Sequence, residues 1–285
     1  MGGSTGLIGR SLVQSLRTRG DQVIELARRG DAGIRWDGRS VPAGALEGAD
    51  AVVNLAGANV AARRWSPEFK EELRQSRILS TRALVEAIRG TQRKPRVLVN
   101  ASAVGFYGPR GDEAVDETAA AGTDFLAQLC KDWEAEARRA DVRSVQLRTG
   151  IVLDENDGAL AKMLPPFKAF VGGPIGSGKQ WMPWIHQQDE VAAVVFCIDR
   201  ELSGPVNLVS PGAVTMQDFA REIGRALHRP AWAPVPAAAL KVLIGEFAEA
   251  LLGGQRAVPS KLLAAGFQFR FPALPEALRD LLERR

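Results

Sequence analysis

Residues 2–9 read Gly-Gly-Ser-Thr-Gly-Leu-Ile-Gly, and this stretch decides the fold. It holds a G-x-x-G-x-x-G pattern at the start of a helix that we expect over residues 7–19. In such a loop Gly3 permits a tight turn, Gly6 lets the backbone approach a pyrophosphate, and Gly9 lets the helix pack closely on a sheet. The helix N-terminus adds free N–H groups and the positive end of its dipole. The expected phosphate-binding residues are Gly3, Ser4, Thr5, Gly6, Leu7, Ile8 and Gly9.

Strand and helix patterns alternate along the rest of the chain. Apolar runs such as AVVNLA at residues 51–56 are typical of strands buried on both faces. The alternation predicts an α/β fold with a Rossmann-type, doubly wound parallel sheet, and favours a phosphate loop over a plain glycine-rich helix start. The expected strands are residues 22–27, 51–56, 96–101, 144–153 and 206–209, and the further helices are 67–88, 124–140, 190–200, 216–227, 237–252 and 274–282.

The order of these elements also predicts the domain organisation. Residues 1–153 are expected to form the nucleotide-binding domain. Residues 154–285 are expected to form a smaller α/β region on the substrate side, with a helical tail from about residue 234. Within it, residues 165–183 are rich in glycine and proline and predict a loop.

One element of the predicted sheet is missing. The glycine loop should follow a strand, but only Met1 and Gly2 precede Gly3. Without that central strand, its two neighbours would keep unsatisfied backbone groups. The sequence therefore predicts that the true start lies a few residues upstream of Met1.

Composition narrows the class of protein. A chain with 46% hydrophobic and 25% charged residues is typical of a globular protein, and we find neither a membrane-length apolar run nor a signal peptide, which predicts a cytoplasmic location. Two cysteines argue against a disulfide framework, and two histidines argue against a His/Cys metal site. The net charge is +4, but the basic residues are scattered along the chain and paired with acids, so the charge gives little support for a nucleic-acid partner.

The end of the second expected strand bears on the choice of nucleotide. It reads Glu25-Leu26-Ala27-Arg28-Arg29. NAD enzymes usually carry an acid where Ala27 stands, bonded to the ribose 2′-OH, whereas arginine can grip a 2′-phosphate bidentately. The pattern favours NADP(H), with a solvated basic turn as the alternative.

Longer motifs extend over almost the whole chain. They are GGSTGLIG at 2–9, NLAGANVAARRW at 54–65, FKEELRQSR at 69–77, SAVGFYG at 102–108, DFLAQLCKDWEAEA at 124–137, LRTGIVL at 147–153, GGPIGSGKQWMPWIH at 172–186 and GGQRAVPSKLLAAGFQFRFPAL at 253–274. In these motifs the chain resembles the atypical extended short-chain dehydrogenase/reductases, and among them the epimerase-family proteins of the YfcH, cell-division-inhibitor-like type. The resemblance implies an NADP-binding Rossmann domain, a small C-terminal domain and a poorly defined reaction.

The resemblance also implies cofactor contacts at matching positions. Arg28 would meet the 2′-phosphate, Arg77 would face the nucleotide from its helix, and Val152 would lie near the nicotinamide. Each has a structural alternative: Val152 is typical of a core residue, and Arg77 could form an ion pair on an exposed face. The full implied set is Arg28, Leu55, Ala56, Glu72, Arg77 and Val152.

The acid–base residues of the superfamily are absent. Ordinary members use a serine and Tyr-x-x-x-Lys, in which the lysine lowers the pKa of the tyrosine. Aligned on Trp133-Glu134, the tyrosine position holds Leu126 and the lysine position holds Cys130. Ser102 and Tyr107 could polarise a carbonyl, but a strand-end cap and loop packing explain them equally well.

A second aromatic segment supplies the other candidates. Trp181 and Trp184 precede His186 and could line a substrate surface. His186 could relay a proton, or it could be a buried structural histidine. Two functions follow: an NADP(H)-dependent oxidoreductase or epimerase acting on an unidentified small substrate, or a non-catalytic NADP(H)-binding protein that reports redox state.

Overall fold

A parallel sheet forms the centre of the molecule, as predicted. The computed structural model describes residues 1–27 and 33–283. Four parallel strands lie in the order β10–β6–β4–β3, with bounds Gly204–Leu208, Arg143–Thr149, Val97–Ala103 and Ala51–Asn54. The parallel pairings and the crossovers between them confirm the Rossmann-type architecture.

Gly2 occupies the position of the expected central strand. Its N–H donates to Val53 O (2.8 Å), and its carbonyl accepts from Leu55 N–H (2.9 Å). On the other side Leu26 N–H donates to Met1 O (2.7 Å), which attaches the two-stranded pair β1 (Leu26–Ala27) and β2 (Ile34–Arg35). The predicted gap is therefore bridged at this one level.

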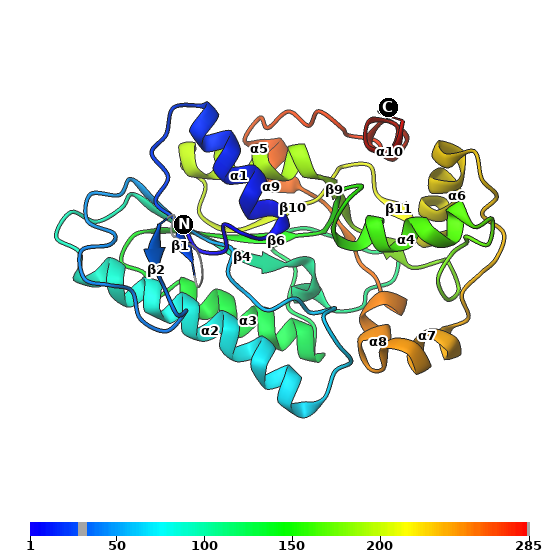
Figure 1. Cartoon of the computed structure of the whole chain (residues 1–285), viewed down its shortest axis with the longest axis horizontal. Helices are drawn as coiled ribbons and strands as arrows, with labels where there is room; N and C mark the ends of the chain where they lie inside the picture. Colours follow the sequence, from blue (N-terminus) through cyan, green and yellow to red (C-terminus); the bar gives the residue numbers. More distant parts are fainter. Residues whose placement is uncertain (28–32, 284–285) are drawn as a thin grey trace.

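Helices cover both faces of the sheet (Figure 1). One layer is α2 (Pro67–Gly90) and α3 (Phe125–Ala137), and the other is α1 (Leu7–Thr18) and α5 (Gln187–Asp199). Ser66 caps α2 by accepting a hydrogen bond from Phe69 N–H, which explains why that helix begins at its proline. The core between sheet and helices contains Leu12, Val53, Val99, Val145, Leu147, Val194 and Val206.

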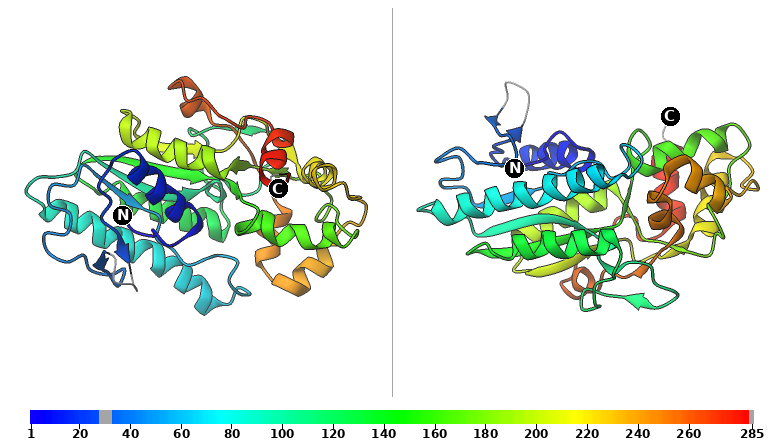
Figure 2. Two further views of the ribbon diagram at one scale, coloured as in Figure 1. Left: turned by 45° about the horizontal axis from the view of Figure 1, so that its top comes forward. Right: turned by 90° about the horizontal axis from the view of Figure 1, so that it is seen from below.

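Several helices after residue 153 gather at one end of the molecule (Figure 2), whereas α5 and the later helix α9 (Ser260–Ala264) lie against the sheet. A second core joins the helices α4 (Gly158–Lys168), α6 (Met216–Leu227) and α10 (Leu274–Leu282). The remaining elements are α7 (Ala237–Ile244), α8 (Phe247–Leu252), the antiparallel pair β8 (Trp181–Met182) and β11 (Val214–Thr215), and the parallel pair β12 (Arg256–Ala257) and β5 (Ala114–Val115). Among the helices of residues 1–27 and 33–283, none combines the length and apolar character that a bilayer crossing needs.

The structure differs from the sequence prediction in several segments. The expected strand 22–27 is reduced to β1, and residues 22–25 form no strand. The expected strand 144–153 breaks at Gly150, where a Cβ would lie 2.6 Å from Pro183 O, and β7 (Ile151–Leu153) leaves to pair with β9 (Trp184–His186). The prediction of a loop over residues 165–183 is wrong at its start, because α4 continues through Pro165 and Pro166 to Lys168. The expected helix 237–252 is two helices that meet at Gly245, whose φ is +65°.

The expected domain boundary at residue 153 does not separate the two parts in space. Both α5 and β10 come from the C-terminal side of that boundary, yet they belong to the nucleotide-binding sheet and its core. Strand β12, near the C-terminus, pairs with β5 from residues 1–153, so the end of the chain also packs on the N-terminal part.

Candidate functional site

The glycine loop has the geometry of a phosphate cradle. Gly3 has a φ of +78°, and a Cβ there would lie 2.5 Å from the carbonyl carbon of Leu55. A Cβ on Gly9 would overlap Gly3 O, so that position also requires glycine. A Cβ on Gly6, in contrast, meets nothing closer than 3.6 Å, and no side chain caps the N-terminus of α1. The loop therefore leaves space and uncapped N–H groups for a ligand.

A cavity of about 410 Å³ lies against this loop. Its walls are Gly3, Ser4, Thr5, Leu26, Ala27, Trp36, Gly38, Ala56, Gly57, Ala58 and Ser80. Within the described residues, the buried Ser4 Oγ and Trp36 Nε1 have no hydrogen-bond partner. Buried polar atoms are almost always paired in folded proteins. Two orphaned polar groups in the wall of one cavity fit a polar ligand such as a dinucleotide.

The 2′-phosphate side of the cavity is only partly described. Arg28 lies outside the described residues. Its neighbour Ala27 pairs with Arg35 across β1 and β2, and Arg35 and Arg39 both line an adjoining hollow. The turn at Asp37 is fixed because its carboxylate accepts from the N–H groups of Arg39 (2.7 Å) and Ser40 (3.0 Å). The sequence prediction missed these two arginines, although IRWDGR places them in one short turn.

Arg77 lies beneath the cofactor cavity. Its guanidinium donates to Ala58 O (3.0 Å) and Leu73 O (3.1 Å), and stands 5.2 Å from the ring of Trp133. Burial lowers the pKa of this arginine. A Cβ built on Gly57 would lie 3.2 Å from Cζ of Arg77, so the guanidinium packs directly against this glycine. Arg77 therefore supports the backbone of the cavity wall, in place of the exposed ion pair considered as the alternative.

The other implied contacts are divided among three places. Glu72 is exposed, forms an ion pair with Arg63 and lines a separate hollow beside α2. Leu7 and Val152 both lie next to Gly158: a Cβ built on that glycine would be 3.3 Å from Leu7 Cδ2 and 3.6 Å from Val152 O. The two residues are therefore close to each other. Leu55 supports the turn at Gly3, next to Ala56 in the cavity wall.

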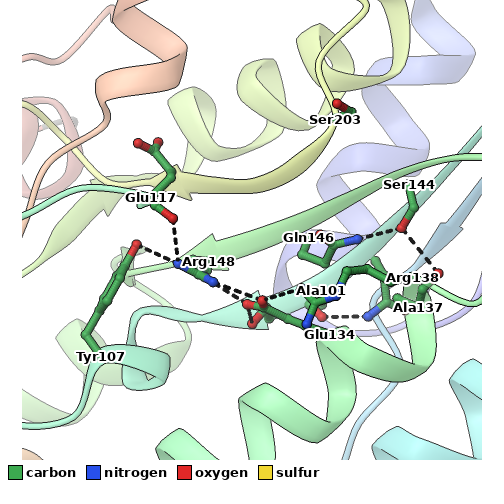
Figure 3. A network of polar contacts seen from close by, with 12 residues as sticks. Ala101, Tyr107, Glu117, Glu134, Ala137, Arg138, Ser144, Gln146, Arg148 and Ser203 are labelled. Carbon is green, nitrogen blue, oxygen red and sulfur yellow. Dashed lines mark hydrogen bonds and ion pairs between the residues drawn. The ribbon is translucent and has the colours of Figure 1, made fainter. Parts of the chain in front are cut away.

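Ser102 is part of a buried ionic network. Its hydroxyl donates to Glu134 Oε1 (2.8 Å). Arg148 donates to both oxygens of the same carboxylate (2.8 and 3.0 Å; Figure 3). Ser102 and Glu134 are buried, as is Arg148. The serine hydroxyl is thus held by a structural carboxylate.

Tyr107 belongs to the same network. Its side chain is fully buried; the hydroxyl donates to Asn207 Oδ1 (2.6 Å) and accepts from Arg148 (3.0 Å). Burial raises the pKa of Tyr107 to about 12. The expectation that Ser102 and Tyr107 polarise a carbonyl therefore does not fit this geometry, because protein groups already bind both hydroxyls.

His186 also has a structural setting. It is 1% exposed, its Nδ1 accepts from Gln188 N–H (3.1 Å) at the start of α5, and its ring stacks on Phe271 at 3.9 Å. Its Nε2 lies 3.3 Å from Asp280 Oδ2. The geometry thus fits the buried structural histidine and not a proton relay. The indole N–H groups of the two tryptophans in this segment also have partners: Trp184 donates to Gly212 O and Trp181 donates to Asp112.

A second cavity, of about 140 Å³, begins at Leu126 in the tyrosine position. Cys130, in the lysine position, is buried, and burial raises the pKa of its thiol to about 12. It therefore stays a protonated, unactivated thiol. The cavity reaches from Gly105 on the sheet side to α8 in the C-terminal part. The sequence prediction missed the contribution of α8, because nothing in its pattern fixes where the tail docks.

Comparison with known proteins places these features in a family context. Residues 1–209 match the NAD dependent epimerase/dehydratase family, and residues 235–281 match a domain of unknown function (DUF1731). An epimerase family protein of Mycobacterium bovis, Mb2239, is 46% identical over 286 residues, which cover 97% of this chain and 94% of that protein.

Solved structures give the same picture. The crystal structure of the human epimerase family protein SDR39U1 with NADPH is 37% identical, with a TM-score of 0.93 over 100% of this chain and 98% of that one. The UDP-glucose 4-epimerase of Thermotoga maritima, solved with UDP-glucose, has a TM-score of 0.79 at 15% identity over 99% and 96% of the two chains, which shows a shared fold alone.

Proposed function

Because this chain belongs to the NAD dependent epimerase/dehydratase family, we propose that it binds NADP(H) at the glycine loop and does so without the family's tyrosine-based proton transfer. The observation that carries the proposal is the cavity beside Gly3–Gly9, in whose wall Ser4 Oγ and Trp36 Nε1 are buried without a partner in the described part of the chain. A bound dinucleotide offers hydrogen-bonding groups to both.

The residues present fit this cofactor along its whole length. The loop Gly3–Gly9 and the N-terminus of α1 would hold the pyrophosphate, and Ala56 would lie along the nucleotide. Leu7 and Val152 would flank the nicotinamide end. NADPH supplies a hydride when bound, and the part of this chain that we can assign is the binding and orientation of the nucleotide.

NADP(H) is preferred to NAD(H) on electrostatic grounds. Ala27 stands where an acid would repel a 2′-phosphate, and Arg35 pairs directly across from it. Arg28, which follows Ala27 in the sequence, adds a second positive charge. The relative SDR39U1, crystallised with NADPH, supports the same preference.

The geometry favours binding over the usual carbonyl chemistry. The hydroxyls of Ser102 and Tyr107 are both held in the buried network, and Leu126 replaces the acid–base tyrosine. The oxidoreductase alternative has one observation in its favour: the second cavity opens at Leu126, next to the position where a substrate would stand. Following NADPH absorbance with a panel of small carbonyl compounds separates the two, because only an oxidoreductase consumes the cofactor.

The binding proposal is tested with Gly6→Val. This residue has extended backbone angles and open space around its Cβ, so the valine should fold normally while filling the pyrophosphate position. Calorimetry should show a loss of NADPH affinity of at least 100-fold. Gly111→Val is the matched control, since a Cβ there meets nothing within 4 Å. Unchanged affinity in Gly6→Val would overturn the proposal.

A further inference from the structure

The second cavity is built from both parts of the chain and has a distinct chemical character. Leu126 and Gly105 form its sheet side, and α8 closes it from the C-terminal part. Its lining residues are Trp65, Gly105, Gly108, Pro109, Asp124, Phe125, Leu126, Glu246, Glu249, Ala250, Gly253, Gly254 and Gln255. No arginine, lysine or histidine of residues 1–27 or 33–283 is among them.

An aromatic cluster forms the apolar wall of this cavity. The ring of Trp65 packs edge-on against Phe125 at 5.2 Å and against Phe247 of α8 at 5.3 Å. Its indole N–H is held by Val60 O (2.9 Å), which fixes the ring in place. The wall is therefore rigid and offers an apolar surface to a ligand.

The charges around the cavity are acidic and largely compensated from outside. Glu246 forms an ion pair with Lys70, and Glu249 lies 3.4 Å from Lys241. Asp124 differs from both. One of its carboxylate oxygens accepts from Ala127 N–H (3.0 Å) and so caps α3. The other oxygen, Oδ2, would lie only 2.8 Å from a Cβ built on Gly108. Gly108 and Asp124 both line the cavity, so this carboxylate is the acceptor that we assign to a ligand there.

We propose that this cavity binds a small, largely apolar alcohol that carries no anionic group, and that it excludes nucleoside diphosphate sugars. A diphosphate is usually recognised by arginine, lysine or an open helix N-terminus, and here the N-terminus of α3 is already capped by Asp124. The volume of about 140 Å³ also falls below the roughly 300 Å³ at which pockets for larger ligands begin. The ligand hydroxyl donates to Asp124 Oδ2, and its apolar part lies against Trp65 and Leu126.

This inference rests on the proposed function, because Leu126 in the cavity wall stands at the position that the tyrosine holds in ordinary members of the superfamily. The experiment uses the full chain loaded with NADPH, whose binding is recorded first by its fluorescence. Saturation-transfer NMR then measures benzyl alcohol, cyclohexanol and 2-phenylethanol as probes, with benzoate and UDP-glucose as matched anionic probes. We expect at least one of the alcohols to bind, and neither anionic probe to bind.

A cavity-filling variant ties the signal to this site. Ala250 is an exposed residue of α8 in the cavity wall, so Ala250→Phe should abolish alcohol binding and leave NADPH affinity unchanged. Ala239→Phe, an exposed alanine of α7 outside the wall, should behave as the unmodified chain. The inference is overturned if no alcohol binds, if Ala250→Phe leaves binding intact, or if UDP-glucose binds and is displaced by Ala250→Phe. A chain that fails to bind NADPH would instead overturn the proposed function.

Discussion

The two halves of the expected active site are preserved to very different degrees. On the nucleotide side, the loop Gly3–Gly9 leaves open space and two buried polar atoms without a partner in the described residues. On the catalytic side, the hydroxyl of Ser102 is hydrogen-bonded to Glu134, and that of Tyr107 to Asn207 and Arg148. A site prepared for a ligand leaves hydrogen-bonding capacity unused, whereas a site that serves the fold consumes it. The comparison indicates a cavity with room for a ligand beside a position where the hydroxyls serve the fold.

The largest effect is expected from breaking the buried ion pair on the catalytic side. Glu134→Gln leaves the buried Arg148 guanidinium without a counter-charge, which typically costs about 3–5 kcal/mol of unfolding free energy. Urea unfolding at pH 7 measures it. The double variant Glu134→Leu/Arg148→Met should lose less than the single one, because neither member of this pair is left buried without its partner. A loss below about 1 kcal/mol in Glu134→Gln would mean that this network does not hold the fold.

The next largest effect is a pH dependence at Glu190. This carboxyl is fully buried in α5, bonded to Thr149 Oγ1 (2.9 Å), and burial raises its pKa from 4.5 to about 8. The folded state therefore holds a proton that the unfolded state releases, so stability is full below pH 4.5 and falls as the pH rises to about 8. The slope approaches about 1.4 kcal/mol per pH unit.

The matched variant for this effect is Glu190→Gln, which keeps the bond to Thr149 without a titrating group. Unfolding free energies at pH 5, 6.5 and 8.5 should diverge, with the variant increasingly more stable than the unmodified chain. Parallel curves would show that Glu190 does not titrate in this range.

A smaller effect sharpens the nucleotide side of the comparison. Arg35→Ala should weaken NADPH by about 1.5–3 kcal/mol, or roughly 10- to 150-fold, because a charge-assisted contact to the 2′-phosphate is lost. NADH, which lacks that phosphate, should change less than threefold in calorimetry. Arg28→Ala, from the sequence, is expected to act in the same way. Arg225→Ala on α6, far along the chain and paired with Glu222, is the control. Equal losses for both nucleotides would contradict the assignment.

The fold was predictable because its signals are local. The glycine loop, the buried apolar runs and the Ser66–Pro67 helix start each act within a few residues, and each appears in the structure where it was expected. The errors arise where packing overrides local preference. Residues of α4 at spacings of four and three, Leu160, Leu164 and Phe167, are buried and keep the helix intact through its prolines.

The candidate site was predictable on one side only. The phosphate loop carries its function in its own backbone, so the pattern suffices. The role of Tyr107 depends on Asn207, one hundred residues away, and on Arg148 from a different strand, and no short pattern connects them. Likewise, the ring of His186 is explained by Phe271, which the sequence gives no reason to place beside it.

The cavity at the glycine loop has walls on two separate pieces of sheet. Ala27 belongs to the pair β1–β2, and Ala56 follows β3 of the four-stranded sheet. A ligand that contacts both walls stabilises their association, and this stabilisation grows with ligand concentration. The nucleotide proposed to bind there would therefore hold the two pieces of sheet together, and the free energy needed to separate them would rise with its concentration.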